Sequence, residues 1–558
     1  MANQASNHST ATIRCYPFGG VGEFGKNMMV YAIGDDAVIV DCGLGFPSPW
    51  HHGIDLLIPD ISALKELGLT IHAILLTHGH EDHIGGLPFL LPQLQLPIYG
   101  TPITLGLLSG KLEELHYKAD LRPLPELEPI TVGPFQVEAI PVTHSIMDAV
   151  SIAIRTPLGY IIHTGDFKLD MAPLDGRATA LHRFAALGDE GVALLAADST
   201  NAPRSGSSAS ERSVGPVLRQ EISSCSGKVV VTTFASNMFR IQQIIDAAHA
   251  NKRKVAFAGR SLERNSTIAR KLGRLNIPAG IMIDIKKSKD IADRDLLIIA
   301  TGSQGESRAA LARLAQNHFP GVRIGVGDLV IFSSSAIPGN ERTISDLVNL
   351  IYRRGARIRH AGQAHLHVSG HAQAHELKTM MHLTRPRYFY PVHGEYRFLQ
   401  EHKQLARQVG IPEERIIIAE NGQSVIADAN SIRHGKGFHA GAVFVDGQAR
   451  DEVDSVVLRD RRTLAEDGLI TATVLISAAE GCLIGQPELT ARGLLHQEIS
   501  EERLDEARNQ LTDYLREQPR EALTDHEALS EDIRIWLRRW CKRTMKKRPM
   551  AIPVVIEI

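Results

Sequence analysis

His78-Gly79-His80-Glu81-Asp82-His83 brings three imidazoles and the Asp82 carboxylate together within six residues. The run follows the apolar stretch Ala73-Ile74-Leu75-Leu76 and precedes the Gly85-Gly86 break. A short loop at the C-terminal end of a strand can direct two imidazoles at one cation, and a carboxylate with a third imidazole at a second cation nearby. Two adjacent cations can bind an oxyanion and generate hydroxide at neutral pH. The run therefore predicts a hydrolytic metal centre and not a solvated histidine-rich loop.

Further polar residues stand where such a centre needs them, each at the end of a β-branched or aromatic run that reads as a strand. They are Asp41 after residues 37–40, His144 after 135–142, Asp166 after 160–165 and His393 after 387–392. One such residue alone would more often be an ordinary strand terminus. Together with the histidine-rich loop they indicate a metal site gathered from several strand ends, which is typical of layered αββα or α/β hydrolytic folds.

The cluster HxHxDH with the later His144, Asp166 and His393 resembles the metallo-β-lactamase superfamily. Other stretches resemble one family of its β-CASP branch, ribonuclease J, from about residue 13 to about residue 440, with a weaker match beyond. These stretches are residues 19–27 (GGVGEFGKN), 76–86 (LTHGHEDHIGG), 163–168 (HTGDFK), 198–202 (DSTNA), 233–237 (TFASN), 259–261 (GRS), 300–306 (ATGSQGE), 333–341, 367–371 (HVSGH) and 391–395 (PVHGE). The first cluster identifies only the superfamily, and the last two make the branch specific.

The resemblance implies an α/β fold, with a metallo-β-lactamase αββα sandwich, an inserted β-CASP parallel α/β domain and a small C-terminal α/β domain. The length of 558 residues predicts roughly three to four domains. We expect the sandwich over residues 1–210 and 363–440, the insert over 211–362, a linker over 441–456 and the last domain over 457–558.

Alternating strands and helices after a Ser- and Gly-rich stretch at 206–215 support the insert. The apolar runs predict strands over 228–233, 254–258, 296–300 and 328–332, and helices over 237–250, 262–272 and 305–316. That this unit interrupts the sandwich is an implication of the resemblance, because spacing alone does not establish it.

By the resemblance, the ligands divide into two sets that share one carboxylate. His78, His80 and His144 hold the first metal; Asp82, His83 and His393 hold the second; Asp166 bridges them. Five imidazoles, two carboxylates and no thiolate fit two zinc ions per subunit, with manganese or magnesium as alternatives. Asp41 and Asp198 are better placed as acceptors that orient metal-bound histidines.

The chemistry implied is hydrolysis of a phosphodiester by a metal-generated hydroxide, in line with the departing 3′ oxygen. The catalytic residues are then Asp82, Asp166 and His371, with His371 contacting the scissile phosphate or donating a proton to the leaving oxygen. The products carry a 5′ phosphate and a 3′ hydroxyl. Because no step uses the ribose 2′ hydroxyl, the choice of RNA over DNA must come from binding.

Two short runs are the expected nucleotide-binding residues: Phe234, Ala235, Ser236 and Asn237, and then His367, Val368, Ser369, Gly370 and His371. Turns rich in Gly and Ser present N–H groups to phosphate. Phe234 could stack on a base, although packing after a strand is the alternative. Residues 302–303 and 333–335 are expected in the same groove, and together these segments predict a pocket that prefers a 5′ monophosphate.

Composition describes an ordinary globular chain. A net charge of −2 argues against a uniformly basic nucleic-acid coat but not against a basic channel. The residues before 13 have no apolar core of a secretory signal, and no run is long enough to span a membrane. The five cysteines, Cys15, Cys42, Cys225, Cys482 and Cys541, form no CxxC pair, which favours reduced thiols in the cytoplasm.

The C-terminal segment predicts a strand over 471–476, helices over 501–517 and 525–542 and a final strand over 553–558. In the ribonuclease J family such a domain supports self-association, so we expect a homodimer or homotetramer, together with partner proteins of RNA decay. Arg538-Arg539-Trp540-Cys541-Lys542-Arg543 and Lys546-Lys547-Arg548 are interpreted as a solvated helix face, with an RNA-contacting patch as the alternative.

The first hypothesis of function is a metal-dependent ribonuclease of RNA processing and decay. It would act on single-stranded RNA as a 5′→3′ exonuclease with endonuclease activity. A small-molecule hydrolase would need neither the insert nor the HVSGH run, and a catalytically inactive scaffold would not need a complete ligand set. The closest rival is a DNA-processing β-CASP enzyme; that branch commonly carries Val at the position of His393, so His393 favours RNA.

Overall fold

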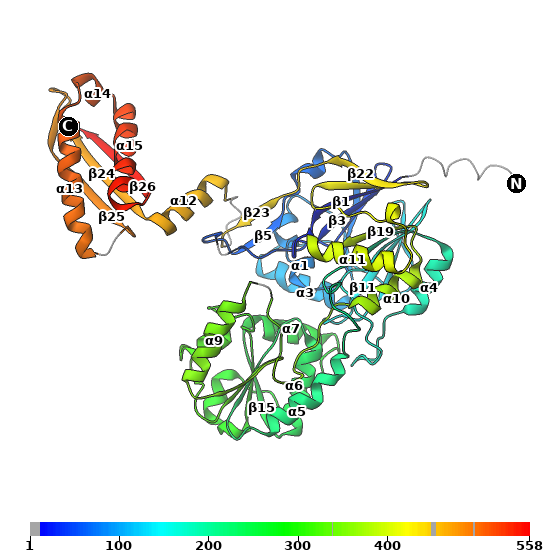
Figure 1. Cartoon of the computed structure of the whole chain (residues 1–558). Coiled ribbons are helices and arrows are strands. Elements are labelled where there is room, and N and C mark those ends of the chain that lie inside the picture. Colours follow the sequence, from blue (N-terminus) through cyan, green and yellow to red (C-terminus); the bar gives the residue numbers. More distant parts are fainter. Residues whose placement is uncertain (1–11, 49, 338, 448–452, 495–496) are drawn as a thin grey trace. The chain divides into compact units, whose positions relative to one another are not determined.

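The computed structural model describes residues 12–48, 50–337, 339–447, 453–494 and 497–558. The chain divides into two units. The first is formed by the chain up to Gly45 and by Ile58–Ala442, and the second by Phe46–Leu57 and Val443–Ile558. Figure 1 colours both units along the sequence, with residues 58–442 running from blue to yellow.

The first sheet of the larger unit has eight strands in the order β22-β21-β1-β3-β4-β6-β7-β8. They are β22 (Ile432–Gly437), β21 (Gln423–Ala427), β1 (Ile13–Gly19), β3 (Met28–Ile33), β4 (Asp36–Val40), β6 (Thr70–Leu75), β7 (Ile98–Gly100) and β8 (Leu121–Pro123). β4, β6, β7 and β8 run parallel, so the loop that follows β6 lies at the same edge as the residue that follows β4.

The second sheet has six strands in the order β19-β13-β12-β11-β10-β9. They are β19 (Tyr388–Val392), β13 (Val192–Asp198), β12 (Gly159–His163), β11 (Val150–Thr156), β10 (Phe135–Pro141) and β9 (Ile130–Val132). β12, β13 and β19 are parallel neighbours, with Ala196 paired to both His163 and Tyr390. The C-terminal ends of these three strands therefore meet at one edge.

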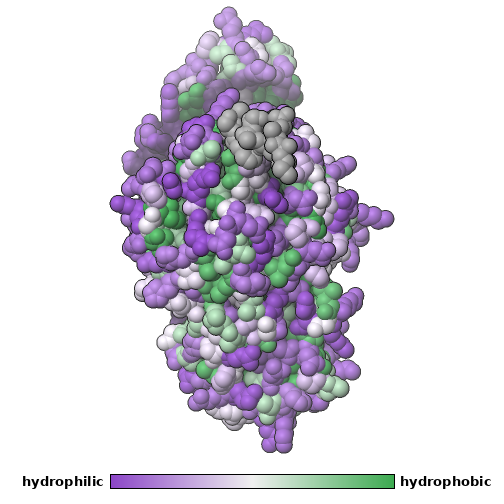
Figure 2. All heavy atoms as spheres, turned by 90° about the vertical axis from the view of Figure 1, so that its right-hand side faces the viewer, coloured by the Kyte–Doolittle hydropathy of each residue, from purple (hydrophilic) through white to green (hydrophobic). Residues whose placement is uncertain are grey.

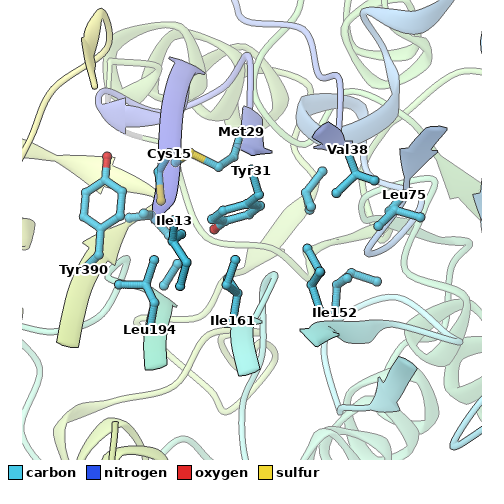
Figure 3. Packing of buried hydrophobic residues seen from close by; sticks show 14 of the residues in the cluster. Ile13, Cys15, Met29, Tyr31, Val38, Leu75, Ile152, Ile161, Leu194 and Tyr390 are labelled. Carbon is cyan, nitrogen blue, oxygen red and sulfur yellow. The ribbon is translucent and has the colours of Figure 1, made fainter. Parts of the chain in front are cut away.

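The two sheets pack face to face on a shared hydrophobic core (Figure 3). Ile13, Tyr31 and Leu75 come from the first sheet, and Ile161 and Leu194 from the second; all are at most 1% exposed. β-branched and aromatic residues suit such pleated, buried surfaces. The core holds the strand ends in fixed positions, and the residues predicted as metal ligands lie at or just beyond those ends.

Helices flank the sandwich. They are α1 (Glu81–Ile84), α2 (Leu87–Leu90), α3 (Pro102–Glu114), α4 (Leu181–Glu190), α10 (Ala374–Thr384) and α11 (Tyr396–Gln408). α10 contacts β13, α11 contacts β19, and α3 contacts β7 and β8, so each sheet has helices against it. The predicted αββα sandwich is confirmed.

The inserted part is a five-stranded, fully parallel sheet in the order β15-β16-β14-β17-β18. Its strands are β15 (Lys254–Ala258), β16 (Leu296–Ala300), β14 (Val229–Thr232), β17 (Leu329–Phe332) and β18 (Arg357–Arg359), and its helices are α5 (Val214–Ser223), α6 (Met238–Ala250), α7 (Arg260–Lys271), α8 (Ala310–Ala315) and α9 (Glu341–Arg353). Because it lies between β13 and β19 in the chain, the predicted interruption of the sandwich is confirmed.

The helix predicted over 305–316 was wrong in its first half, since only α8 is an α-helix there. Gly302 and Gly305 adopt φ of 107° and 80°, which lie in the left-handed region. A Cβ at Gly305 would meet the Thr343 backbone carbonyl carbon at 2.7 Å. The segment is thus a turn packed against α9 and cannot continue a helix. The expected linker at 441–456 likewise contains a strand, β23 (Ala442–Val445).

The smaller unit has a three-stranded sheet in the order β25-β24-β26, formed by β25 (Leu483–Arg492), β24 (Leu469–Ile476) and β26 (Met550–Glu557). Its helices are α12 (Ser455–Asp467), α13 (Gln497–Arg516), α14 (Arg520–Thr524) and α15 (His526–Met545). Alternate residues of β24, such as Ile470 and Val474, are buried with Leu511 of α13 and Leu537 of α15. The predicted small α/β domain is confirmed.

Figure 2 shows one face of the molecule, on which hydrophobic residues are scattered among hydrophilic ones. Large apolar side chains that are exposed include Phe46, Trp50 and Val326. Within the described part of the chain, no helix has the length and apolar character needed to cross a membrane.

Candidate metal centre

Every predicted metal ligand lies in the segment that follows a strand of the sandwich. His78 and His80 follow β6, while Asp82 and His83 lie in the one-turn helix α1. The remaining three also follow strands: His144 follows β10, Asp166 follows β12 and His393 follows β19. His393 has φ of 55°, a left-handed conformation that is uncommon outside glycine and clusters at functional sites.

The first group joins three imidazoles and one carboxylate. His80 Nδ1 lies 3.0 Å from His78 Nε2 and 3.1 Å from His144 Nε2. Both of these Nε2 atoms lie 3.6 Å from Asp166 Oδ2. Four potential ligand atoms thus converge on one point.

The second group joins two imidazoles and two carboxylates. His83 Nε2 and His393 Nε2 each lie 3.5 Å from Asp82 Oδ2. The same two nitrogens lie 3.4 Å and 3.3 Å from Asp166 Oδ1. All seven residues predicted as ligands are therefore brought together in two groups that share Asp166.

Asp166 divides its two oxygens between the groups. Oδ2 faces His78 and His144, whereas Oδ1 faces His83 and His393. The side chain is 3% exposed, so each oxygen must find its partners inside the protein. A carboxylate with one oxygen toward each group has the geometry of a bridge between two cations.

Two buried atoms support the fit of this donor set to metal ions. Asp166 Oδ1 and His393 Nε2 have no hydrogen-bond partner among the described residues. Buried polar atoms without partners are costly and uncommon in folded proteins. Both atoms point into the second group, where a cation would satisfy them. Imidazole nitrogens and carboxylate oxygens are suitable ligands for zinc.

Burial and nearby charges shift the pKa values of the histidines in opposite directions in the two groups. Burial lowers the pKa of His78 and His144 well below the ordinary value and that of His80 to about 4, so these rings stay neutral. Burial also opposes protonation of His83 and His393, but nearby carboxylates, Asp166 first, raise the pKa of both well above the ordinary value. The second group therefore gathers positive charge between its carboxylates, and metal binding there would release protons.

Asp41 orients one ligand from behind, as predicted. Its Oδ2 accepts a hydrogen bond of 2.7 Å from His83 Nδ1. The backbone N–H and the hydroxyl of Thr77 donate to the same carboxylate, both at 2.8 Å. With Nδ1 committed to Asp41, the Nε2 of His83 is turned toward Asp166. Such carboxylate–imidazole contacts raise the basicity of the ligand and fix its ring.

Asp198 holds two histidines at once. Its Oδ2 lies 2.8 Å from His371 Nδ1, and its Oδ1 lies 3.3 Å from His393 Nδ1. The Thr200 hydroxyl lies 2.9 Å from His393 Nδ1 and donates to Asp198 Oδ1. His371 Nδ1 also lies 3.9 Å from Asp166 Oδ2. His371 is thus beside the ligand groups, and its Nε2 is the ring nitrogen that Asp198 does not hold.

The run 367–371 is joined to the metal groups through its backbone. Gly370 O accepts a hydrogen bond of 2.7 Å from His144 Nδ1. A Cβ at Gly370 would lie 2.8 Å from the His144 ring, so only glycine permits this approach. The Ser369 hydroxyl oxygen accepts from Asn201 Nδ2 and from the His371 backbone N–H. Val368 is buried, and His367 Nε2 lies 3.2 Å from the hydroxyl oxygen of Ser335.

The run Phe234-Ala235-Ser236-Asn237 lies between β14 and α6. Phe234, Ala235 and Ser236 are half-buried, so they can meet a ligand. Asn237 is 3% exposed, and its side chain accepts from the Arg240 N–H to cap α6. The Asn237 side chain therefore has a structural task that sequence reasoning did not assign to it.

Arg240 is a buried residue beside the predicted binding runs, and sequence reasoning did not identify it. It is fully buried and forms a two-point ion pair with Glu211, at 2.7 and 2.9 Å. Its Nη1 also donates to Ser333 O, Ser333 Oγ and Leu366 O. One guanidinium thus ties the 211 segment and the start of α6 to residues 333 and 366. An arginine inside an amphipathic helix carries no local signal of such burial.

Asn27 is a second residue near the ligands that lacked an assigned role. Its Nδ2 donates to Asp82 O at 2.9 Å and lies 3.1 Å from His83 Nε2. The amide therefore steadies the loop that carries both ligands. Its place in the motif at 19–27 was the only signal in the sequence, but the motif does not say which residue it contacts.

We expect His371→Ala to lower turnover about 10²- to 10⁴-fold, the usual contribution of a positioned proton donor. Metal content should be unchanged, because Asp198 and not a metal group holds His371 Nδ1. Elemental analysis of the purified variant beside cleavage rates measures both. His365→Ala, a matched change of a histidine whose partner is Ser213, should leave both unchanged. Loss of metal from the His371 variant would place that residue among the ligands.

The comparison with protein families matches four parts of the chain. Residues 21–194 match the metallo-beta-lactamase superfamily and residues 226–351 match the ribonuclease J beta-CASP domain. Residues 356–418 match a zinc-dependent metallo-hydrolase RNA specificity domain, and residues 456–558 match the ribonuclease J C-terminal domain.

Curated relatives align over nearly the whole chain. Ribonuclease J of Thermus thermophilus is 41% identical, with 98% of this chain and 95% of the relative covered. Ribonuclease J of Helicobacter pylori is 37% identical, with 98% and 80% covered. A solved structure of a protein of unknown function from Enterococcus faecalis aligns with a TM-score of 0.53 at 17% identity, covering 75% of this chain and all of the other, and it supports the fold alone.

Proposed function

The chain belongs to the ribonuclease J family, and we propose that it hydrolyses single-stranded RNA from the 5′ end, with additional endonuclease activity. The single observation that carries the proposal is the position of Asp166 between two groups of imidazoles. A site of this kind, with His371 beside it, has what phosphodiester hydrolysis requires. The phosphate needs charge neutralisation, the attacking oxygen needs activation, and the leaving oxygen needs a proton.

We propose two divalent ions, preferably zinc, with manganese or magnesium as alternatives. The first group, His78, His80 and His144, would hold one, and Asp82, His83 and His393 the other, with Asp166 between. When bound, such a pair supplies a hydroxide nucleophile at neutral pH and neutralises charge on the phosphate oxygens.

The protein's own side chains prepare the site for this chemistry. Asp41, Asp198 and Gly370 O contact the Nδ1 atoms of His83, His393 and His144 in turn, which leaves the Nε2 of each ring facing inward. The contact of Asp198 with His371 leaves the Nε2 of that ring for the leaving oxygen. Burial alone would lower the pKa of His371, but the negative charges of Asp198 and Asp166 raise it by more than burial lowers it. The pKa of His371 is therefore above its ordinary value. A raised pKa favours the protonated ring, which is the form that can supply a proton to the leaving oxygen.

The 5′ phosphate is proposed to bind near Ser335, His367 and Ser369. The Ser369 hydroxyl oxygen accepts two hydrogen bonds, so its own proton stays free for a phosphate. Burial lowers the pKa of His367 to about 3, assisted by the positive charges of Arg240, Lys168 and Arg204. Arg240 and Lys168 are buried in ion pairs with Glu211 and Asp170, so Arg204, which is exposed, is the cation of this set that would meet a phosphate. The Ser333 hydroxyl, by contrast, donates a hydrogen bond to Leu366 O, so it stabilises the wall of the proposed pocket and does not face the phosphate.

The experiment that tests the proposal uses one RNA with either a 5′ monophosphate or a 5′ triphosphate and a label at that end. We expect faster degradation of the monophosphorylated RNA and release of single nucleoside 5′-monophosphates. The reason is that a closed pocket with few donors accepts one phosphate but excludes the bulk and charge of three. Thin-layer separation of the labelled products over time measures both rate and product.

A matched control is the same RNA circularised, which has no 5′ end and reports endonuclease activity alone. Equal rates on monophosphate and triphosphate ends would remove the 5′ pocket from the proposal. Cleavage of DNA of the same sequence at the rate of RNA would instead favour the DNA-processing alternative. Hydrolysis of a β-lactam or thioester in place of RNA would favour a small-molecule hydrolase.

We propose further that the C-terminal unit mediates self-association to a homodimer or homotetramer. One face of its sheet packs on α13 and α15, while Ile552, Val554 and Ile556 of β26 are each more than 40% exposed. Exposed apolar rows on a sheet are typical of protein interfaces.

We propose further that proteins of RNA decay are partners and that the location is cytoplasmic. All five cysteines are free thiols, which agrees with a reducing compartment. The domain limits predicted from sequence, 1–210, 211–362, 363–440, 441–456 and 457–558, also stay a proposal.

A further inference from the structure

The C-terminal end of α15 and the segment after it carry a concentration of positive charge that the metal centre does not use. We call it the basic patch; its members are Arg538, Arg539, Lys542, Arg543, Lys546, Lys547 and Arg548. Seven of the eleven residues from 538 to 548 are cationic and none is acidic. The chain as a whole has a net charge of −2, so this concentration is local.

Helical geometry places these charges on one face. Arg538, Lys542 and Lys546 recur every four residues, and Arg539 and Arg543 follow the same spacing one position on. All five are exposed. The opposite face carries the buried residues Ile533, Leu537, Trp540 and Cys541, which pack in the core of the unit. From 538 to 545 the helix rises about 10 Å, so the face is long enough to follow several phosphates of a strand.

Four acidic residues of the unit form ion pairs with arginines outside the basic patch. Glu466 pairs with Arg462, Glu506 with Arg503, Asp505 with Arg508 and Glu531 with Arg534. Within the described part of the chain, no member of the basic patch forms an ion pair. Two members make hydrogen bonds to neutral acceptors: Arg543 Nη2 donates to Gln510 Oε1 at 3.2 Å, and Lys547 Nζ donates to the backbone oxygen of Glu466 at 3.4 Å. The positive charge of the basic patch is therefore not neutralised by ion pairs among the described residues, and it is available to a partner molecule.

A purely structural reason accounts for part of the patch only. Cations in the last turn of a helix stabilise its C-terminal end, by about 0.3–1 kcal/mol each. Lys542 and Arg543 are in that position in α15. Arg538 and Arg539 lie earlier in the helix, and residues 546–548 lie beyond its end. A solvated helix face, the interpretation favoured from sequence, does not explain why acidic partners are absent from the whole face among the described residues.

We propose that the basic patch is a second RNA-binding site, which contacts the phosphates of the strand and not its bases. Charge complementarity favours a polyanion, and four of the seven members are arginines, whose guanidinium groups match phosphate geometry. Trp540, within the patch segment, is buried, and Trp536 is half-buried against Trp540 and Tyr514, so neither offers much surface for base stacking. Binding should therefore be independent of sequence. The choice of RNA among polyanions rests on the proposed function.

The test measures binding of a long single-stranded RNA by the full-length protein at several salt concentrations, with Asp166→Asn in every variant to prevent cleavage. The patch variant carries Arg538→Gln, Arg539→Gln, Lys542→Gln and Arg543→Gln. The control removes the same charge from the same unit by Arg462→Gln, Arg503→Gln, Arg508→Gln and Arg516→Gln. For the patch variant we expect Kd to rise about tenfold or more, and the salt slope to fall by about 0.7 for each phosphate that the protein no longer neutralises. The control should bind as the parent does.

Equal affinity and equal salt slope in the patch and control variants would overturn the proposal. Unchanged RNA binding with a smaller, salt-sensitive oligomer in sedimentation would also overturn it, because the patch would then bind an acidic surface of a second copy. If the patch variant fails to fold, Lys546→Gln, Lys547→Gln and Arg548→Gln beyond the helix must give the same direction of change. Cleavage of a short 5′-monophosphorylated oligonucleotide by the unmodified protein tests the proposed function separately.

Discussion

Asp166→Ala abolishes hydrolysis in our account, with a loss of about 10³-fold or more, because removing a bridge withdraws several kcal/mol of transition-state stabilisation. Both carboxylate oxygens are used, one by each imidazole group, so no neighbouring side chain can replace them. The metal content should fall with the activity. Binding of RNA should persist, since Ser335, His367 and Ser369 are unchanged. Elemental analysis, cleavage rates and RNA binding of the same preparation measure the three effects.

A matched aspartate gives the control for this variant. Asp189 lies on the surface, where it pairs with Arg385, and its side chain is 78% exposed. Asp189→Ala should keep full metal content and full activity, because exposed ion pairs contribute little. Near-normal cleavage by Asp166→Ala would show that this carboxylate is not the bridge.

Arg240→Met should lower the free energy of unfolding by about 3–5 kcal/mol, because it leaves the buried Glu211 carboxylate without its counter-charge. The same change removes three hydrogen bonds that fix Ser333 and Leu366, so the preference for a 5′ monophosphate should weaken as well. Urea-induced unfolding measures the first effect and the labelled-RNA assay the second.

Two further variants separate charge burial from loss of packing. Combining Arg240→Met with Glu211→Gln removes both charges and should be less destabilising than Arg240→Met alone. Arg264→Met breaks a more exposed pair with Glu114, whose carboxylate is 65% exposed, and should cost less than about 1 kcal/mol. If Arg240→Met costs no more than Arg264→Met, the buried pair does not have the role assigned to it.

The strand patterns predicted that polar residues would meet at strand ends, whereas the division of the predicted ligands into two sets came from the family resemblance. His144, Asp166 and His393 stand after β10, β12 and β19, and parallel strands bring such ends to one edge. The bridging position of Asp166 was implied by the family resemblance alone, since residue patterns do not give the direction of each carboxylate oxygen. Which Nδ1 is held by Asp41, Asp198 or Gly370 O likewise depends on side-chain placement.

Other features of the structure could not be predicted, because a sequence pattern describes one helix or strand and not its contacts with distant segments. Arg240 occurs in a helix where a charged residue is normally exposed, and its burial follows from Glu211, far away in the chain. The helix predicted over 305–316 was shortened by glycines whose conformation depends on packing against Thr343. The sequence leaves two interpretations of the basic run at 538–548, and the ion pairs of neighbouring acidic residues support the RNA-binding proposal.

The central claim is that two cations lie on either side of Asp166, and anomalous scattering from a crystal of the metal-loaded protein tests it most directly. Data collected above and below the zinc absorption edge locate the ions and identify the element. Our account predicts two peaks. One should be bounded by His78, His80 and His144, and the other by Asp82, His83 and His393, with an oxygen of Asp166 directed at each. A single peak, or a peak held by Asp198 and His371 in place of either group, would contradict it.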